Sequence, residues 1–270
     1  MKTLSSVLNT VRQSSPALYW IGLFNFFVAG IALAGMFIDD RSLMGVSVWL
    51  KPFKFGISTG IYILTVGFMS TLYPFSTRKR NVINNIVSWT LFVEILIIAT
   101  QGARGVQSHY NQSSAFDGIL FAIMGLFIGI NVLLMVVFLI ETIRLKLAVP
   151  TSVQWAIGLG WLTILAGSWV GGQMISQVAH NVGVADGGAG LPIVNWSTVA
   201  GDLRVAHFFG IHAIQVLPLF AWLLYQKWST TSRYRTLAVS GFFLLYAGWI
   251  AFTFYQAKQG LPLLAVGPNP

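Results

Sequence analysis

Seven long apolar segments divide the sequence, and they constrain the fold more than any other feature. Each is long enough to cross a hydrocarbon layer of about 30 Å as a helix that rises about 1.5 Å per residue. An isolated segment in lipid can satisfy its backbone hydrogen bonds only as a helix. The predicted spans are residues 17–38, 53–73, 82–101, 116–140, 153–176, 203–225 and 236–255. We therefore predict an all-α, polytopic transmembrane bundle of about seven helices, forming a single integral membrane domain over residues 1–270.

The composition agrees with a chain whose solvent is the lipid bilayer. Charged residues make up 9% of the sequence and hydrophobic residues 56%, whereas soluble domains carry about 25% charged residues. The absence of cysteine excludes disulfides and thiolate metal sites. The formal net charge of +9 comes from basic residues in short loops between apolar spans. That pattern indicates membrane topology and not nucleic-acid binding.

The distribution of basic residues predicts the orientation of the chain, because lysine and arginine accumulate in cytoplasmic loops. We expect the N-terminus in the cytoplasm, the C-terminus outside, and a multi-pass protein of the cell inner membrane. The cytoplasmic segments would then hold ten basic residues: Lys2, Arg12, Arg78, Lys79, Arg80, Arg144, Lys146, Lys227, Arg233 and Arg235. The outer segments would hold six: Arg41, Lys51, Lys54, Arg104, Arg204 and Lys258.

Two segments outside the spans have patterns of their own. Residues 2–15 are predicted to form a small interfacial helix with Leu4, Val7, Leu8 and Val11 on its apolar side. The longest loop, residues 177–202, is rich in glycine and is expected on the outer side. It is interpreted either as a lid over an outer cavity or as a flexible connector.

Polar residues recur at helical spacing inside three of the spans, and polar faces of membrane helices turn away from lipid. Such faces predict a polar cavity that opens to the outside. The sets are Gln173, Gln177 and His180; Thr90, Glu94 and Gln101; and Arg204, His207, His212 and Gln215.

Glu94 lies well inside the third predicted span, where an ionised carboxylate is costly. The functional interpretation is a proton-carrying or cation-binding group that is protonated at neutral pH when unpaired. The structural interpretation is a protonated acid that is tied to a neighbouring helix by a hydrogen bond. The general behaviour of acids within membranes favours the functional interpretation.

All four histidines, His109, His180, His207 and His212, map to the predicted outer half. His207 and His212 are five residues apart, so their side chains diverge by about 140° on a regular helix. That spacing is poor for chelating one zinc ion but suits partners on two sides of the helix. Haem b, another metal, or two histidines hydrogen-bonded within a polar interior all remain as interpretations.

Four basic residues are expected in one outer layer, and we call them the basic collar: Lys51, Lys54, Arg104 and Arg204. Such a collar suits phosphate, carboxylate or haem propionates. The alternative is a set of side chains that extend to the lipid headgroups. For Arg204, on the same arc as the histidines, we prefer a functional role.

The preferred functional hypothesis is a redox protein that binds haem b in its outer half, with the four histidines as candidate axial or metal ligands. Arg104, Arg204, Lys51, Lys54 and Gln173 are the candidate cofactor-binding residues, and a small-molecule substrate or quinone is a candidate partner. One alternative is a hydrolase of lipid-derived substrates, in which the histidines and Asp202, Asp186 or Asp117 bind zinc or another metal and activate water. The candidate catalytic residues are Glu94 and Asp202. The other alternative is a small-anion transporter or receptor that uses the basic collar, with Glu94 as a coupling proton site.

Overall fold

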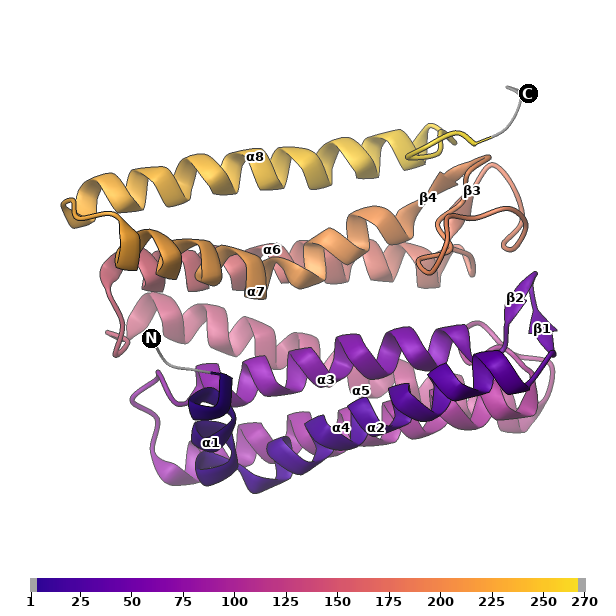
Figure 1. Cartoon of the computed structure of the whole chain (residues 1–270), viewed down its shortest axis with the longest axis horizontal. Helices are drawn as coiled ribbons and strands as arrows, with labels where there is room; N and C mark the ends of the chain where they lie inside the picture. The colour runs from indigo at the N-terminus through magenta and orange to yellow at the C-terminus, as the bar shows by residue number, and fades with distance from the viewer. Residues whose placement is uncertain (1–3, 267–270) are drawn as a thin grey trace. The chain divides into compact units, whose positions relative to one another are not determined.

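The computed structural model describes residues 4–266, and this part of the chain is built almost entirely from helices (Figure 1). Two antiparallel pairs of two-residue strands lie in the connections between helices. The elements are α1 (Leu4–Ser14), α2 (Pro16–Ile38), β1 (Ser42–Leu43), β2 (Val46–Ser47), α3 (Leu50–Ser70), α4 (Thr77–Arg104), α5 (Ala115–Arg144), α6 (Thr151–Ser176), β3 (Asn181–Val182), β4 (Gly201–Asp202), α7 (Leu203–Lys227) and α8 (Ser232–Lys258).

Seven of the described helices, α2 to α8, are long and apolar enough to cross a membrane. Six of them contain a whole predicted span, and α3 contains residues 53–70 of the predicted span 53–73. The all-α, polytopic membrane fold predicted from the sequence is therefore confirmed. The helices extend beyond the apolar segments because polar residues continue them. For example, α4 begins after Ser76, whose side chain accepts a hydrogen bond from the backbone of Lys79, although apolar residues begin only at Val82. The predicted orientation of the two termini stays a prediction.

The chain divides into two compact units, residues 1–134 and residues 135–270, and α5 passes from the first into the second. We describe each unit by itself and call them unit 1 and unit 2. The prediction of a single integral membrane domain stays a prediction.

Helices α2 and α3 approach closely inside unit 1 because small residues line their contact. A β-carbon at Gly56 of α3 would lie 2.7 Å from the backbone oxygen of Asn25 on α2. Helix α4 approaches α3 in the same way, since a β-carbon at Gly102 would lie 2.7 Å from the ring of Pro52. The three helices therefore have little space between their backbones, as is usual for packing in lipid.

The short helix α1 agrees with the predicted N-terminal helix, although residues 2 and 3 of that segment lie outside the described residues. It packs against α2 and α3 (Figure 1). Val11 is fully buried, and a β-carbon at Gly67 of α3 would lie 2.7 Å from its side chain. Leu4, in contrast, is 75% exposed. Only part of the apolar side of α1 is thus covered by the protein.

Unit 2 is organised around a close contact between α6 and α7. A β-carbon at Gly167 would lie 2.7 Å from the backbone of Gly210, so both positions need glycine. Helix α8 packs along both helices, and Tyr246 donates a hydrogen bond of 2.7 Å to the backbone oxygen of Phe209. Within the last part of α5, Phe138 stacks on Trp161 of α6 with ring centroids 4.8 Å apart.

Large apolar side chains cover the outward faces of the long helices. Leu126 and Leu133 of α5 are 62% and 67% exposed, and Leu244 and Leu245 of α8 are 67% and 76% exposed. A soluble monomer rarely exposes apolar surface on this scale. Lipid is the solvent that such surfaces require.

Candidate functional site

The predicted polar face of α4 lies in the interior of unit 1. Thr90, Glu94 and Gln101 are 7%, 2% and 0% exposed, respectively. They share one side of the helix because successive members are four and seven residues apart. The polar side chains of α4 thus turn away from lipid, as expected for a membrane helix.

One oxygen of the Glu94 carboxyl is buried in unit 1 without a hydrogen bond. This atom, Oε2, has no hydrogen-bond partner among the described residues. Most buried polar side-chain atoms in proteins have at least one partner. An acid left in this state is a candidate for a function that requires its protonation to change.

A hydrogen bond between α5 and α4 lies one turn away from Glu94. Nδ2 of Asn131 donates to Oγ1 of Thr90 at 2.8 Å and to the backbone oxygen of Phe127 at 2.9 Å. The Oδ1 atom of the same amide is buried and has no partner in the described part of the chain. Asn131 therefore ties the two helices together and still presents an unused acceptor.

Two further buried asparagines present unused polar atoms in unit 1. Asn84 of α4 is 1% exposed, and neither atom of its amide has a partner within residues 4–266. Asn25 of α2 is fully buried, and its Oδ1 atom is likewise unpartnered. The sequence analysis did not single out Asn25, Asn84 or Asn131. An amide within an otherwise apolar span is the signal that would have identified Asn25 and Asn131.

The end of α4 is joined to the start of α5 by a network around Asp117. Its Oδ1 atom accepts hydrogen bonds from Gln101 at 2.8 Å and from Arg104 at 2.6 Å. Its Oδ2 atom accepts one from Ser114 at 2.7 Å. Asp117 is only 4% exposed, so these donors replace the water that its charge would otherwise need. The charge of Arg104 is thereby neutralised within the protein.

Lys51 has a different kind of neighbour from Arg104. Its Nζ atom lies 3.1 Å from Nδ1 of His109, in the loop after α4. Oγ of Ser108 lies 3.2 Å from the same ring nitrogen. A lysine that contacts a histidine, a base, is chemically unlike one paired with a carboxylate. This contact was not predicted, because Lys51 and His109 are far apart in the sequence.

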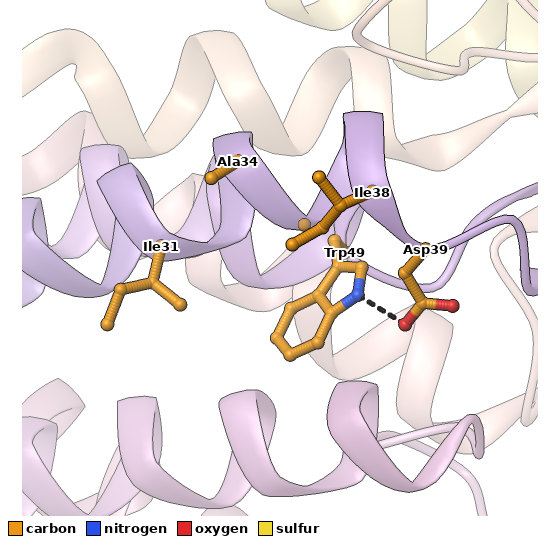
Figure 2. A pocket seen from close by; sticks show the side chains of 6 residues that line it. Ile31, Ala34, Ile38, Asp39 and Trp49 are labelled. Carbon is orange, nitrogen blue, oxygen red and sulfur yellow. Dashed lines mark hydrogen bonds between the residues drawn. The ribbon is translucent and has the colours of Figure 1, made fainter.

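A shallow groove of about 340 Å³ lies at the β1–β2 end of α2 (Figure 2). Ile31, Ala34 and Ile38 form its apolar part, and Trp49 donates a hydrogen bond of 2.7 Å to Asp39 at its polar end. The guanidinium of Arg41 also binds Asp39 and, together with Trp49, holds the pKa of that carboxyl well below its usual range. The groove thus offers apolar surface beside a carboxylate that is already bonded.

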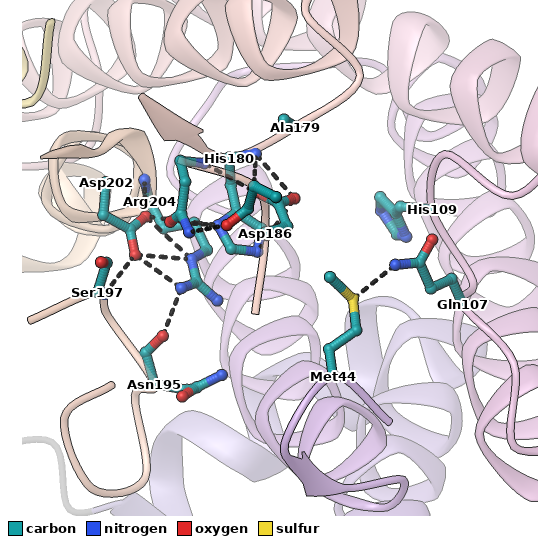
Figure 3. Close-up of polar contacts among 12 residues, drawn as sticks. Met44, Gln107, His109, Ala179, His180, Asp186, Asn195, Ser197, Asp202 and Arg204 are labelled. Carbon is teal, nitrogen blue, oxygen red and sulfur yellow. Dashed lines mark hydrogen bonds and ion pairs between the residues drawn. The ribbon is translucent and has the colours of Figure 1, made fainter. Parts of the chain in front are cut away.

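His180 lies among carboxylates in the long loop of unit 2 (Figure 3). Its backbone nitrogen donates to Asp186 at 3.0 Å, and its ring Nε2 lies 3.3 Å from the same carboxylate. Its ring Nδ1 lies 3.9 Å from Asp202. Burial lowers the pKa of His180 and the charge of Arg204 lowers it further, while the two carboxylates act in the opposite direction.

Asp202 caps the N-terminus of α7 and binds the loop at the same time (Figure 3). Its carboxylate accepts hydrogen bonds from the backbone of Ser197 at 2.9 Å and of Arg204 at 2.9 Å. The guanidinium of Arg204 lies 2.6 Å from Asp202 and donates to the backbone oxygen of Asn195. All of these partners belong to the protein itself, so the arrangement stabilises the loop on α7. A catalytic role for Asp202 stays a prediction.

The two histidines of α7 have different neighbours, as their spacing predicted. Nδ1 of His207 lies 2.8 Å from the backbone oxygen of Gly167 on α6. His207 lies close to Gly171, where a β-carbon would be 3.1 Å from its ring. His212 packs its ring on Phe208 with centroids 4.6 Å apart. His207 is thus a contact between two helices, which is the structural interpretation of a buried histidine.

One predicted polar face is wrong in detail. Helix α6 ends at Ser176, and Gln177 caps it, so His180 belongs to the following loop and not to a helical face shared with Gln173. The chain turns at Val178, which has a left-handed φ of 52°. The prediction that Gln101, Gln173, His180, Arg204 and His207 surround one outer cavity concerns both units and stays a prediction.

The fold and these sites define a polytopic, all-α integral membrane protein, embedded in the lipid bilayer by the seven long apolar helices found within residues 4–266. It is similar to UPF0756 membrane proteins: that of Proteus mirabilis is 34% identical over 80 residues, which are 28% of this chain and 51% of the relative. The one from Photorhabdus laumondii is 33% identical over 75 residues, 27% of this chain and 49% of the relative. The one from Pectobacterium carotovorum is 35% identical over 90 residues, 31% of this chain and 59% of the relative.

The chain spans about half the length of the curated relatives that it matches. No family model matches it. No solved structure matches it either. The names of the similar proteins describe membrane proteins and state no reaction, cofactor or ligand.

The function expected from the sequence is therefore wrong. A haem b redox protein and a metal-dependent hydrolase find no support in the similar proteins, and within residues 4–266 no three His, Cys, Asp or Glu side chains are grouped to hold a metal. The small-anion alternative relied on the basic collar, but Arg104 is paired with Asp117 and Arg204 with Asp202. The physical reason is that the sequence shows which residues are charged but not which of them form ion pairs in the folded protein. Binding of haem b or zinc as such stays a prediction.

Proposed function

We propose that this protein carries protons across the membrane through unit 1, with Glu94 as the group that accepts and releases them. The observation behind the proposal is a carboxyl that is 2% exposed within a membrane-spanning helix and whose Oε2 atom has no hydrogen-bond partner in the described residues. Acids inside membrane helices are rare and mark proton or ion pathways.

A purely structural acid would be expected to look different. It would be protonated and hydrogen-bonded to a neighbouring helix, as Asn131 is bonded to Thr90. Leaving a buried polar atom unsatisfied costs about 1–3 kcal/mol. A proton carrier accounts for that cost, because a carboxyl that alternates between two partners cannot be held permanently by one.

The buried asparagines supply polar atoms on the Thr77 side of Glu94. Asn84 lies ten residues before Glu94 on α4, which corresponds to about 15 Å along the helix. Its amide, and the Oδ1 atoms of Asn25 and Asn131, are unpartnered in residues 4–266. Buried polar groups of this kind are the sites at which internal water molecules bind. We infer that water joins them into a proton path in the half of unit 1 that precedes Glu94.

A proton carrier must be located in a particular kind of membrane. A proton carrier acts across a membrane that holds a proton gradient, and the excess of basic residues in one set of loops supports the cell inner membrane. We include this location in the proposal. A small-molecule or quinone partner stays a separate prediction.

The test uses the full chain reconstituted in liposomes that enclose a pH-sensitive dye. A potassium gradient with valinomycin drives protons inward, and dye fluorescence reports the rate. We expect the wild type to exceed protein-free liposomes, and Glu94→Gln to fall to their rate, because glutamine keeps the shape but cannot carry a proton.

Glu141→Gln is the matched control. Glu141 lies on α5 and is 9% exposed, but it lies 3.8 Å from Arg144, at the end of its helix. We expect this variant to keep the wild-type rate. A wild type no faster than protein-free liposomes contradicts the proposal, as does a Glu94→Gln variant with wild-type flux and an unchanged unfolding temperature.

A further inference from the structure

Lys51 and His109 are in contact at the β1–β2 end of unit 1. Lys51 is the second residue of α3, and His109 is half-buried in the loop that follows α4. Nζ of Lys51 lies 3.1 Å from Nδ1 of His109, which is a normal hydrogen-bond distance. The histidine ring is held by aromatic neighbours, with centroids 5.6 Å from Phe55, 6.1 Å from Tyr110 and 6.3 Å from Phe121.

This contact limits the number of protons that the two residues hold. An ammonium has three donors and no acceptor, and an imidazolium has two donors and no acceptor. A hydrogen bond between them therefore requires a lone pair on one of the two nitrogens. A charged Lys51 donates to neutral His109, charged His109 donates to neutral Lys51, or a neutral Lys51 donates to neutral His109. The pair therefore carries at least one proton fewer than two separate cations would.

Two arginines at this end of unit 1 are paired with carboxylates. Arg41 binds Asp39 and Arg104 binds Asp117, so each positive charge is matched by a carboxylate. Lys51 contacts a base, His109. Pro52, the residue after Lys51, packs against Gly102, which lies eight residues after Glu94 on α4, so Lys51 lies on the Arg104 side of the buried acid. Ser108, whose Oγ lies 3.2 Å from Nδ1, is a second polar contact of the ring.

We propose that Lys51 and His109 form a relay that takes the proton from Glu94 and releases it at the β1–β2 end of unit 1; this rests on the proposed function. A proton leaves the Glu94 carboxyl for the neutral amine of Lys51 through bridging water, giving a carboxylate and an ammonium. The Lys51 proton then moves to Nδ1 of His109, which restores the amine and forms an imidazolium. His109 releases one proton to water and returns to its neutral form.

The first experiment measures proton flux in the same liposomes for Lys51→Met and His109→Gln. We expect each to lower the flux by about 100-fold, the lower end of the effect of a positioned acid–base group. Lys54→Met, one turn further along α3, and His212→Gln, on α7, are matched controls and should keep the wild-type rate.

Failure of the relay and failure of the carrier give different results. If Glu94→Gln stops the flux while Lys51→Met and His109→Gln keep it, the relay is wrong and the carrier stands. If the wild type shows no flux, the proposed function itself fails.

The second experiment does not depend on flux. The protein is labelled with ¹⁵N at histidine, placed in lipid nanodiscs, and the His109 signals are identified by their loss in His109→Gln. Because Lys51 contacts Nδ1, we expect the Nδ1 signal to shift in Lys51→Met and to stay in place in Lys54→Met. Identical His109 signals in the wild type and Lys51→Met would overturn the relay, since no proton would then be shared.

Discussion

Nη1 of Arg104, in the last turn of α4, lies 2.6 Å from Oδ1 of Asp117, in the first turn of α5. The ion pair joins the two helices at the ends of the loop formed by residues 105–114. Asp117 is 4% exposed, whereas the Arg104 side chain is 39% exposed. The buried carboxylate therefore depends on the ion pair to replace its lost hydration, whereas the guanidinium is still hydrated.

Removing the charge of Asp117 should weaken this junction. Asp117→Asn keeps the size of the side chain but replaces an ion pair and charge-assisted hydrogen bonds with weaker neutral ones. We expect a loss of about 1–3 kcal/mol in the free energy of unfolding. Unfolding in detergent micelles, followed by circular dichroism, measures the change. Asp40→Asn is the control, since Asp40 is exposed and surface substitutions usually change stability by less than about 0.5 kcal/mol. Equal losses in both variants would contradict the prediction.

The contact between α6 and α7 predicts a strong difference between two glycines of one helix. In Gly167→Ala the new β-carbon would lie 2.7 Å from the backbone of Gly210, so the helices must move apart. We expect a loss of about 1–3 kcal/mol, typical of overpacking. The measurement is the unfolding temperature of the purified protein.

Gly172→Ala provides the comparison for that variant. Nothing lies within 4 Å of a β-carbon at this position. Alanine also favours a helix over glycine by up to about 1 kcal/mol. We expect the unfolding temperature to stay equal or to rise. A Gly167→Ala variant as stable as Gly172→Ala would show that α6 and α7 are not in close contact.

The buried histidine of the long loop predicts a pH-dependent opening. In the closed loop, burial lowers the pKa of His180 below its usual value of 6.5. Between that lowered value and 6.5, the open loop therefore binds a proton that the closed loop does not. The stability of the closed loop is complete above about pH 6.5 and falls as the pH drops below it.

Amide hydrogen exchange measures this opening at the backbone nitrogens of His180 and Asn181, which donate to Asp186. After correction for the intrinsic effect of pH, protection should be weaker at pH 5.5 than at pH 7.5. His180→Gln should remove this difference, and His212→Gln should keep it. A difference that persists in His180→Gln would assign the effect to another group.

The seven spans and the buried face of α4 could be predicted because they depend on local patterns. A long apolar segment must be helical in lipid, and helical spacing alone places Thr90, Glu94 and Gln101 on one side. The interior position of Glu94 follows from the same reasoning, since lipid does not solvate a carboxyl.

The pairing of charged groups could not be predicted because it depends on contacts between distant segments. Arg104 binds Asp117 only because α5 returns beside α4, and Lys51 meets His109 only because the loop after α4 folds over the start of α3. Both cations had been assigned to one basic collar from their expected depth. The end of α6 at Ser176 was also missed, because spacing does not report where a helix stops.

The orientation of the chain in the membrane determines which side of the membrane His109 faces and which side the other end of the path from Glu94 faces. The sequence contains no cysteine, so single cysteines can be introduced without a background. Lysine and arginine are enriched in the loops predicted to be cytoplasmic. Arg78→Cys and Lys146→Cys should therefore resist a membrane-impermeant thiol reagent in intact cells and react after permeabilisation. Asp40→Cys and Val184→Cys, both exposed in loops at the other ends of the helices, should react in intact cells. Labelling of Lys146→Cys without permeabilisation would reverse the predicted orientation, and with it the direction in which the relay faces the cell.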